Sequence, residues 1–343
     1  MTRRQAYNAA ALGAALLLAA LFPVLVPNGA FETVAIFTLI YIAMASAWNI
    51  LGGYTGYVSL GHAAFFGVGA YAFTILCKAW NVPAGWVTFL MLLAAGAVAG
   101  ILAIPFGWIA LRARRHTFVV ITIAYLFIFQ LLAYNLTNLT NGSAGIGAPI
   151  PPWMGSSFNI PFFYVALALA VAVIVLSALI RRSRFGLSLL AIRDDEDRAL
   201  GLGIPTGRLK LTAFVIAAIF IAMAGALYAY YVTFIYPQYA MNPLDDLSMA
   251  LMAFLGGVGT VAGPVIGALI VEPSQQYFTI AFQSGLNLIT YGGLFLVVIL
   301  FIPRGLWPTI RDALKARAER VRAQSAVEPP AEATRLSAKG GSS

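Results

Sequence analysis

Few residues of this 343-residue chain are of the types that perform chemistry, and they are widely scattered. The two histidines and 12 acidic residues form no nucleophile–base set and no His–Glu spacing typical of a metal site. A single cysteine, Cys77, excludes an intramolecular disulfide and argues against a thiolate metal cluster. The chain also has no Gly-x-x-x-x-Gly-Lys-Ser/Thr phosphate loop. These residues predict a chain that is not an enzyme, that binds no metal or cofactor and that hydrolyses no ATP itself.

Glu272 is the acidic residue that the sequence places well inside an apolar segment, whereas Glu32 lies at the edge of one. An intramembrane carboxylate is typical of ion-coupled transporters, where it binds or relays the ion. We expect Glu272 to be hydrogen-bonded beside Pro273, and His62 to be a packing residue. An ion-coupled secondary transporter that uses Glu272 remains an alternative at this point.

The composition of the chain indicates that these scattered polar residues are positioned by membrane-spanning helices. Hydrophobic residues make up 61% of the chain and charged residues 10%, against about 25% charged in soluble domains. Apolar runs near 20 residues recur, which is the length that crosses the hydrocarbon core as a helix. We therefore predict an all-α polytopic membrane protein of about ten transmembrane helices. The predicted spans are 9–27, 31–50, 57–77, 85–111, 117–135, 161–180, 211–231, 246–258, 263–283 and 286–303.

Two of these predicted spans have unusual features. The run 9–27 is long for a signal peptide and is followed by a poor cleavage site, so we expect it to remain as the first span. The segment 246–258 is short for a full crossing, so it is expected to be tilted, broken or re-entrant.

The basic residues predict the orientation of the chain. With the N-terminus in the cytoplasm, 20 of the 21 Lys and Arg residues fall on the cytoplasmic side, leaving only Lys78 outside. This distribution also explains the net charge of +9 without invoking nucleic acid. Residues 1–322 are predicted to form the transmembrane domain, and 323–343 a cytoplasmic tail of disordered composition. The uncharged external loop Leu136–Ile160 is expected to be ordered by turns.

The segment Asn49–Tyr71 is the first that indicates function. Its glycines let the backbone leave helical geometry and let helices approach closely. A Leu-Gly-Gly sequence at 51–53 recurs at 255–257, and transporters often contain repeats with interrupted helices near the pathway. The candidate residues of a translocation path are Asn49, Gly52, Gly53, Gly56, Ser59, Gly61, Phe65, Gly256 and Gly257.

The second such segment is the loop 181–210. Its acidic run Asp194–Asp197 is expected to open a short helix, because carboxylates cap free N–H groups and favour the positive end of the helix dipole. Asp194 and Arg198 have the spacing of an i,i+4 ion pair. Gly201 and Gly203, followed by Pro205, predict its end. A helix with such defined ends favours a docking element over a solvated surface helix.

Several motifs are shared with a known family. The first reads Asn49-Ile50-Leu51-Gly52-Gly53-Tyr54-Thr55-Gly56, then Ser59-Leu60-Gly61-His62-Ala63-Ala64-Phe65 and Gly69-Ala70-Tyr71. Others follow at 183–214, 222–228, 255–264 and 303–306. The chain resembles the permease subunits of branched-chain amino-acid ABC importers over about residues 31–307. The Ala191-Ile192-Arg193 stretch resembles the larger of the family's two permease types.

The resemblance implies a set of partners and a location. Such permeases pair with a second, similar permease in the bacterial inner membrane, bind two cytoplasmic ABC ATPases, and receive substrate from an extracytoplasmic binding protein. ATP and Mg²⁺ are then held by the ATPases, which dock on the loop that contains Arg193, Glu196, Ala199 and Gly203. Related importers of urea or short amides share much of the pattern and remain open as alternatives.

Two positions depart from the family's pattern. The coupling loop reads Glu196-Asp197-Arg198-Ala199, where the family usually has alanine soon after the glutamate, and Tyr57 stands where glutamine is common.

Overall fold

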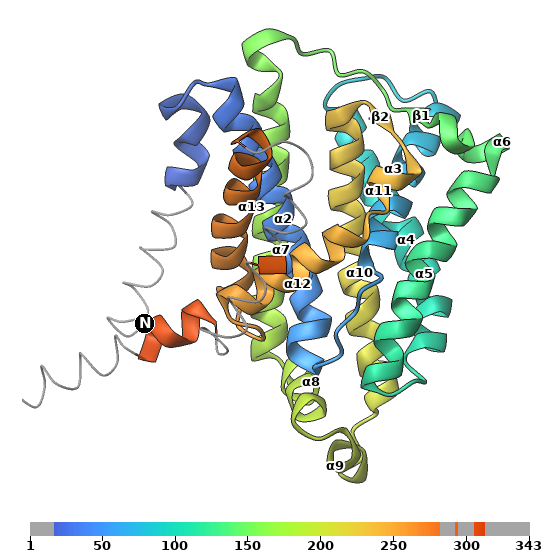
Figure 1. The fold of residues 1–343 in the computed structure, drawn as a ribbon, viewed down its shortest axis with the longest axis vertical. Coiled ribbons are helices and arrows are strands. Elements are labelled where there is room, and N and C mark those ends of the chain that lie inside the picture. Colours follow the sequence, from blue (N-terminus) through green and yellow to red (C-terminus); the bar gives the residue numbers. More distant parts are fainter. Residues whose placement is uncertain (1–16, 282–291, 294–304, 313–343) are drawn as a thin grey trace, which may run out of the picture.

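A computed structural model of the protein describes residues 17–281, 292–293 and 305–312 (Figure 1). Residues 9–16 of the predicted first span, all of the predicted last span except residues 292–293, and the tail 323–343 lie outside the described residues. The long helices are α2 (Gly29–Thr55), α3 (His62–Ala79), α4 (Met91–Ala110), α5 (Arg115–Asn135), α7 (Asn159–Arg182), α10 (Thr206–Val232), α12 (Pro243–Gly256) and α13 (Gly263–Ala281). The short helices are α6 (Thr137–Thr140), α8 (Arg184–Asp194), α9 (Glu196–Gly201) and α11 (Pro237–Ala240), with 3₁₀ turns η1 (Val87–Leu90), η2 (Gly142–Ala144) and η3 (Gly155–Ser157).

Six helical segments in the described part of the chain are long and apolar enough to cross a membrane. They are Gly29–Thr55, His62–Ala79, Val87–Ala110, Arg115–Asn135, Asn159–Arg182 and Thr206–Val232. The predicted all-α polytopic membrane protein is thereby confirmed, while the count of ten spans and the position of the termini stay predictions.

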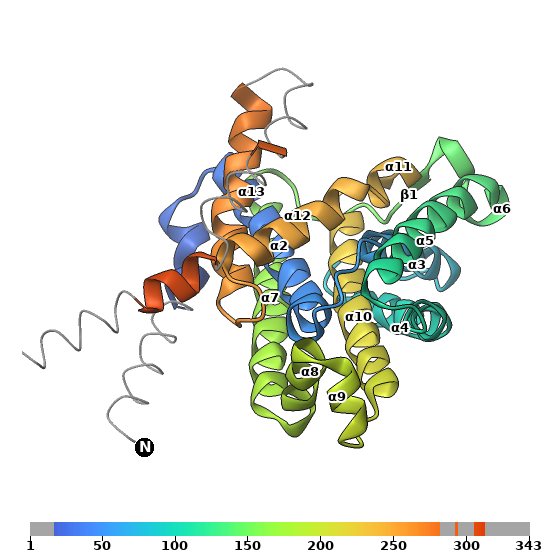
Figure 2. The same cartoon turned by 60° about the horizontal axis from the view of Figure 1, so that its bottom comes forward.

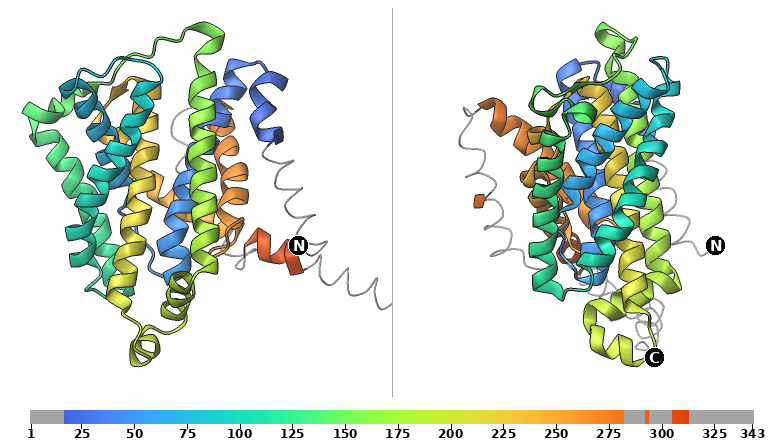
Figure 3. Two further views of the ribbon diagram at one scale, coloured as in Figure 1. Left: turned by 180° about the vertical axis from the view of Figure 1, so that it is seen from behind. Right: turned by 90° about the vertical axis from the view of Figure 1, so that its right-hand side faces the viewer.

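The helices form one bundle with α10 near its centre (Figures 1 and 3). Helix α10 packs most extensively on α3 and α4, and α2 packs on α7, α10, α12 and α13. Helices α8 and α9 project from one end, which we call the α9 end (Figure 2). The opposite end carries α6 and the two-residue strands β1 (Ile146–Gly147) and β2 (Phe234–Ile235), which pair antiparallel. The loop 136–160 therefore consists of short turns and bridges, as its composition predicted.

The chain between α2 and α3 is an extended segment buried inside the bundle. Gly56 ends α2 in the left-handed region, at φ 73°, which glycine adopts without steric cost. The chain then turns back along α2, because the indole Nε1 of Trp48 donates to the Ser59 carbonyl at 2.8 Å. Trp48 lies seven residues before the end of α2, or about 10 Å along its axis. Helix α3 consequently begins within the bundle and not at its end.

Helices α12 and α13 form a hairpin whose first arm is short. Helix α12 has 14 residues, about 21 Å, and begins at Asn242, whose side chain accepts a hydrogen bond from the Leu244 amide. Its N-terminal end lies at mid-height of the bundle (Figure 1). The segment expected to be short at 246–258 is therefore a short helix at 243–256, and its path relative to the membrane stays a prediction. Pro273 does not break α13, which runs through it from Gly263 to Ala281.

Close packing of α3 on α10 depends on glycine. A Cβ atom on Gly225 would collide with the carbonyl oxygen of Phe66, and one on Gly69 with that of Ala222. Since both obstacles are backbone atoms, neither can move without separating the helices. The motif glycines of this segment thus allow the two backbones to touch.

We expect Gly225→Val to destabilise the bundle by about 1–3 kcal/mol, because the added atoms must push α10 away from α3. Gly207→Val is the matched control in the same helix, since no atom lies within 4 Å of a Cβ built there. Thermal unfolding in detergent measures both. Equal melting temperatures for the two variants would contradict this account of the interface.

Candidate functional site

The α8–α9 loop is built by two successive helix caps. Ser183 caps α8, accepting from the Gly186 amide, and Asp195 caps α9, accepting from the Arg198 amide at 3.0 Å. The prediction that the acidic run opens a helix is confirmed. The predicted pairing of Asp194 with Arg198 is wrong, because Arg198 pairs with Asp195 at 3.0 Å. Asp194 is the last residue of α8, so it does not share the helix that i,i+4 spacing requires.

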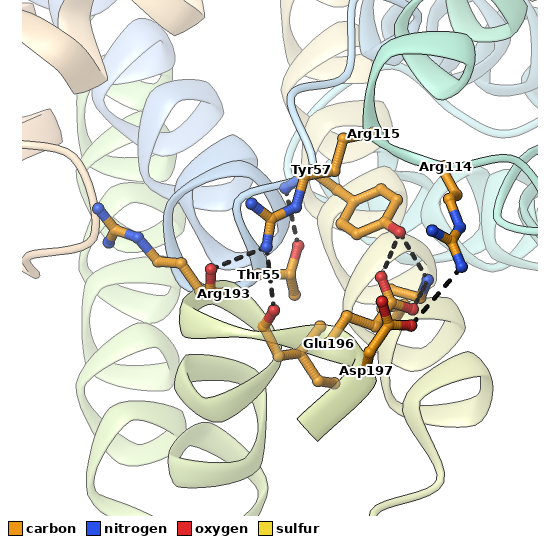
Figure 4. Close-up of polar contacts among 9 residues, drawn as sticks. Thr55, Tyr57, Arg114, Arg115, Arg193, Glu196 and Asp197 are labelled. Atoms are coloured by element: carbon orange, nitrogen blue, oxygen red, sulfur yellow. Dashed lines mark hydrogen bonds and ion pairs between the residues drawn. The ribbon is translucent and has the colours of Figure 1, made fainter. Parts of the chain in front are cut away.

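Glu196, Tyr57 and Lys210 form a polar cluster where α9 meets the bundle (Figure 4). The Lys210 ammonium donates to Glu196 Oε1 at 2.5 Å and to the Tyr57 hydroxyl at 3.0 Å, and that hydroxyl donates to Glu196 Oε2. The side chain of Lys210 is 4% exposed and that of Glu196 is 26% exposed. Partial burial makes this charged network stronger than a surface ion pair.

The cluster fixes the protonation states of its members. Burial by itself would raise the pKa of the Glu196 carboxyl, but the hydrogen bonds from Lys210 and Tyr57 outweigh it and hold the pKa below its ordinary value. Burial and the adjacent Glu196 carboxylate raise the pKa of the Tyr57 phenol. At neutral pH Glu196 is therefore ionised and Tyr57 is a neutral donor.

Arg193 and Arg115 connect the loop to the helices. The guanidinium of Arg193 donates to the Gly53 carbonyl in the last turn of α2 at 2.8 Å. Arg115, in the first turn of α5, donates to the Arg193 carbonyl at 2.8 Å and to the Ile192 carbonyl at 3.2 Å (Figure 4). These carbonyls end α8, where the helix dipole favours positive charge. The loop thus contacts α2, α5 and, through Lys210, α10.

Asn49 and Arg181 hold the turn between α12 and α13 against the end of α2. The Asn49 side chain donates to the Thr260 carbonyl at 2.9 Å and accepts from the Gly259 amide at 2.8 Å. Arg181 of α7 donates to the Gly259 carbonyl. The two Leu-Gly-Gly segments of the sequence therefore lie side by side, at the ends of α2 and α12.

The structure brings most predicted path residues together but buries them. Asn49, Ser59 and Phe65 are fully buried, and Phe65 packs on the rings of Phe129 and Phe214. The predicted glycines serve close approach and turns. Gly52 lies against Trp48, Gly53 against Asn49, Gly61 against Thr122 and Gly256 against Gly263, whereas Gly56 and Gly257 have positive φ. These contacts give each residue a packing role in this conformation.

The remaining residues of the predicted coupling loop differ in environment. Ala199 is buried and its carbonyl accepts from the Ile204 amide. Gly203 is exposed, has φ 81°, and has no atom within 4 Å of a Cβ built on it. A surface of this kind is open to a partner.

Glu272, the acid that the sequence places within an apolar segment, is joined by a second buried carboxylate at the start of α12. Asp246 is 1% exposed and accepts from the amides of His62 and Ala63, so it caps α3. Asp245 accepts from the Tyr41 hydroxyl at 2.9 Å, and Tyr41 lies near the middle of α2. The signal for this helix start was Asn242-Pro243 followed by two acids. This helix start was missed because α12 begins inside the bundle.

Glu272 is buried, and its carboxylate accepts a hydrogen bond from the side-chain amide of Gln276 at 3.0 Å.

Apolar helices of membrane-spanning length, an interrupted α2–α3 connection and a charged helical loop at one end are typical of a polytopic membrane transport protein. The family described as branched-chain amino acid transport system, permease component, matches residues 30–303, and the chain belongs to this family.

The chain is similar to permease proteins of high-affinity branched-chain amino acid transport systems. The high-affinity branched-chain amino acid transport system permease protein LivM of Salmonella typhimurium is 28% identical over 341 residues, covering 92% of this chain and 78% of the relative. LivH of Escherichia coli, from the system of the same name, is 26% identical over 284 residues, covering 78% and 90%. An L-arabinose ABC transporter permease protein of Azospirillum brasilense is 28% identical over 141 residues, covering 38% and 40%. No solved structure matches the chain significantly.

We expect Lys210→Met to destabilise the protein by about 1–3 kcal/mol, because it leaves the partly buried Glu196 carboxylate without its cation. The lowered pKa means that this contribution is fully present above the unfolded-state pKa of Glu, about 4.3, and is lost as the pH falls through the folded-state pKa. Unfolding free energies in detergent between pH 8 and pH 3 measure the difference.

Arg114→Met is the control for that substitution. Arg114 and Asp197 are 3.6 Å apart but 89% and 79% exposed, so this variant should change stability by less than about 0.5 kcal/mol. If the two variants were equally stable at pH 7, the cluster would not act as a buried charged network.

Proposed function

We propose that this chain is one of two permease subunits of an ATP-driven importer of the bacterial inner membrane. It forms half of a translocation path with a second, homologous permease. Two cytoplasmic ABC ATPases dock on the α8–α9 loop, and an extracytoplasmic binding protein delivers the substrate. Family membership over residues 30–303 supports this assembly, as does the absence of a phosphate loop from the sequence.

We further infer that the α9 end faces the cytoplasm, that both termini are cytoplasmic and that about ten helices cross the membrane. The concentration of Lys and Arg at 112–115 and 181–210 supports this orientation. Both segments lie at the α9 end of the structure.

The observation that carries the proposal is the set of contacts from the α8–α9 loop into the bundle. Arg193 binds the end of α2, and Glu196 binds Tyr57 at the start of the extended segment and Lys210 at the start of α10. A displacement of α9 by a closing ATPase dimer would therefore move the end of α2, the α2–α3 segment and α10 together. Polar contacts of this kind are directional, so they transmit a shift better than apolar sliding contacts.

The proposed substrates are the branched-chain amino acids leucine, isoleucine and valine. LivM and LivH relatives, which cover most of the chain, carry this specificity in their names, whereas the arabinose permease covers 38% of it. Urea and short amides are the alternative substrates that the motifs shared with related importers leave open.

Purification from native membranes in mild detergent tests the proposal. We expect a P-loop ATPase and a second permease to be recovered in stoichiometric amounts, and the reconstituted complex to import leucine when its binding protein and ATP are present. A chain that remains folded and alone in several gentle detergents would contradict the importer assignment. An ion-coupled carrier would then need consideration.

Gly203→Val should lower uptake per ATP hydrolysed, because a β-branched residue is strained at φ 81° and would remodel the end of α9. Gly201→Val is the control, since Gly201 has helical geometry and open space around it. Both uptake and ATPase rates are measured in proteoliposomes. Unchanged coupling in Gly203→Val, in a normally assembled complex, would count against α9 as the docking helix.

A further inference from the structure

A partly enclosed cavity of about 160 Å³ lies between α2, α3, α10 and the start of α12. It is at the level of Tyr41, which is 14 residues, or about 21 Å, from the end of α2 at the α9 end. The cavity therefore lies deep inside the bundle and far from the Glu196 cluster.

One wall of this cavity carries a carboxylate. Asp245 lines it and accepts from the Tyr41 hydroxyl at 2.9 Å. No Lys, Arg or His within residues 17–281, 292–293 and 305–312 forms an ion pair with Asp245. Its place in the first turn of α12 favours the ionised form through the helix dipole, which opposes the effect of burial, and the Tyr41 hydroxyl adds a neutral donor. A partly buried carboxylate that lines a cavity and has no paired cation favours a positively charged ligand.

The lining of the cavity is also rich in aromatic side chains. The rings of Phe66 and Phe37 contact Tyr228 with centroids 5.4 and 6.2 Å apart, and all three residues line the cavity. Aromatic faces attract cations and also bury alkyl groups. A volume near 150 Å³ holds a benzene ring in an engineered protein cavity, so this one accommodates a branched alkyl group of four or five carbons.

Asn242 supplies a polar group beside the carboxylate. It lines the cavity, and its side-chain oxygen is occupied by the Leu244 amide. The amide nitrogen of Asn242 is the group with donor capacity that can meet a ligand carboxylate.

We propose that this cavity is a transient binding site for the ammonium group and alkyl side chain of an apolar amino acid, with Asp245 as the ammonium acceptor and Phe37, Phe66 and Tyr228 as the apolar wall. The inference rests on the proposed function for the claim that such a ligand passes through this chain. A bare metal ion is disfavoured, because hard cations require several oxygen ligands and this cavity is mainly aromatic.

The site is mechanically connected to the α9 end. Helix α12 starts at the cavity with Asp245 and ends at the Gly257–Thr260 turn, which Asn49 and Arg181 bind. Arg193 binds Gly53 beside the same turn. Movement of the α8–α9 loop would therefore shift the whole of α12 and withdraw Asp245 from the ligand.

The test uses two leucine analogues, each of which lacks one of the two charged groups, as ligands of the purified, full-length protein in its complex. The amine 3-methylbutylamine has the alkyl group and the ammonium, and 4-methylpentanoate has the alkyl group and the carboxylate. We expect the amine to raise the melting temperature of the wild type and the acid to have little effect. Asp245→Asn should weaken the amine effect by about 10–100-fold in apparent affinity, since it removes a charge-assisted hydrogen bond.

Glu272→Gln is the matched control, because it neutralises another buried carboxylate outside the cavity and should keep the wild-type response. If Asp245→Asn fails to fold, Tyr228→Leu replaces it and should weaken the amine effect about 2–5-fold through loss of the aromatic face. The proposed site would be wrong if the amine and the acid raised the melting temperature equally, or if the amine did not raise it. It would also be wrong if Asp245→Asn left the effect of the amine unchanged.

Uptake by the reconstituted complex separates this inference from the proposed function. If the wild type imports leucine and Asp245→Asn imports it equally well, the site is wrong and the importer stands. If the wild type binds the amine in an Asp245-dependent manner but imports no leucine, the importer assignment is wrong and the site stands.

Discussion

The backbone that leaves helical geometry inside this apolar bundle must find hydrogen-bond partners within the protein, because lipid offers none. The segment between α2 and α3 and the turn between α12 and α13 are the two places where this constraint is strongest. Asn49, Trp48 and the arginines Arg181 and Arg193 meet it by binding carbonyl and amide groups of these segments. Trp48 binds the segment that follows its own helix, whereas Asn49, Arg181 and Arg193 each join elements that are distant in sequence.

This requirement also explains why the α8–α9 loop is connected so directly to the interior. The guanidinium groups that satisfy backbone carbonyls at the ends of α2 and α12 come from α7, which precedes the loop, and from α8, which is part of it. Glu196 adds a second connection through Tyr57 and Lys210. The polar groups that stabilise the irregular backbone are therefore the same groups through which a motion of α9 reaches α2, α10 and α12.

The ends of interrupted helices place charge within the bundle. Asp246 caps α3 and Asp245 faces the cavity at the start of α12, so the N-termini of both helices are matched by carboxylates. The Asp246 carboxylate accepts hydrogen bonds from two backbone amides, whereas the Asp245 carboxylate accepts one from the Tyr41 hydroxyl. The adjacent residues Asp245 and Asp246 thus have different roles, because Asp246 binds the N-terminus of α3 and Asp245 lines the cavity.

The sequence by itself determined the class of protein, the six membrane-length segments and the caps of α9, because apolar run length, charge asymmetry and local capping depend on neighbouring residues. It also predicted the short segment at 246–258. Only the tertiary structure decided that Tyr57 joins Glu196 and Lys210, that Arg198 pairs with Asp195, that Asp246 is buried and that Asp245 lines a cavity. Tyr57 and Glu196 are 139 residues apart, and the depth at which α12 begins depends on its packing against α2 and α3. No local pattern specifies such contacts, since they depend on how the whole bundle brings helix ends together.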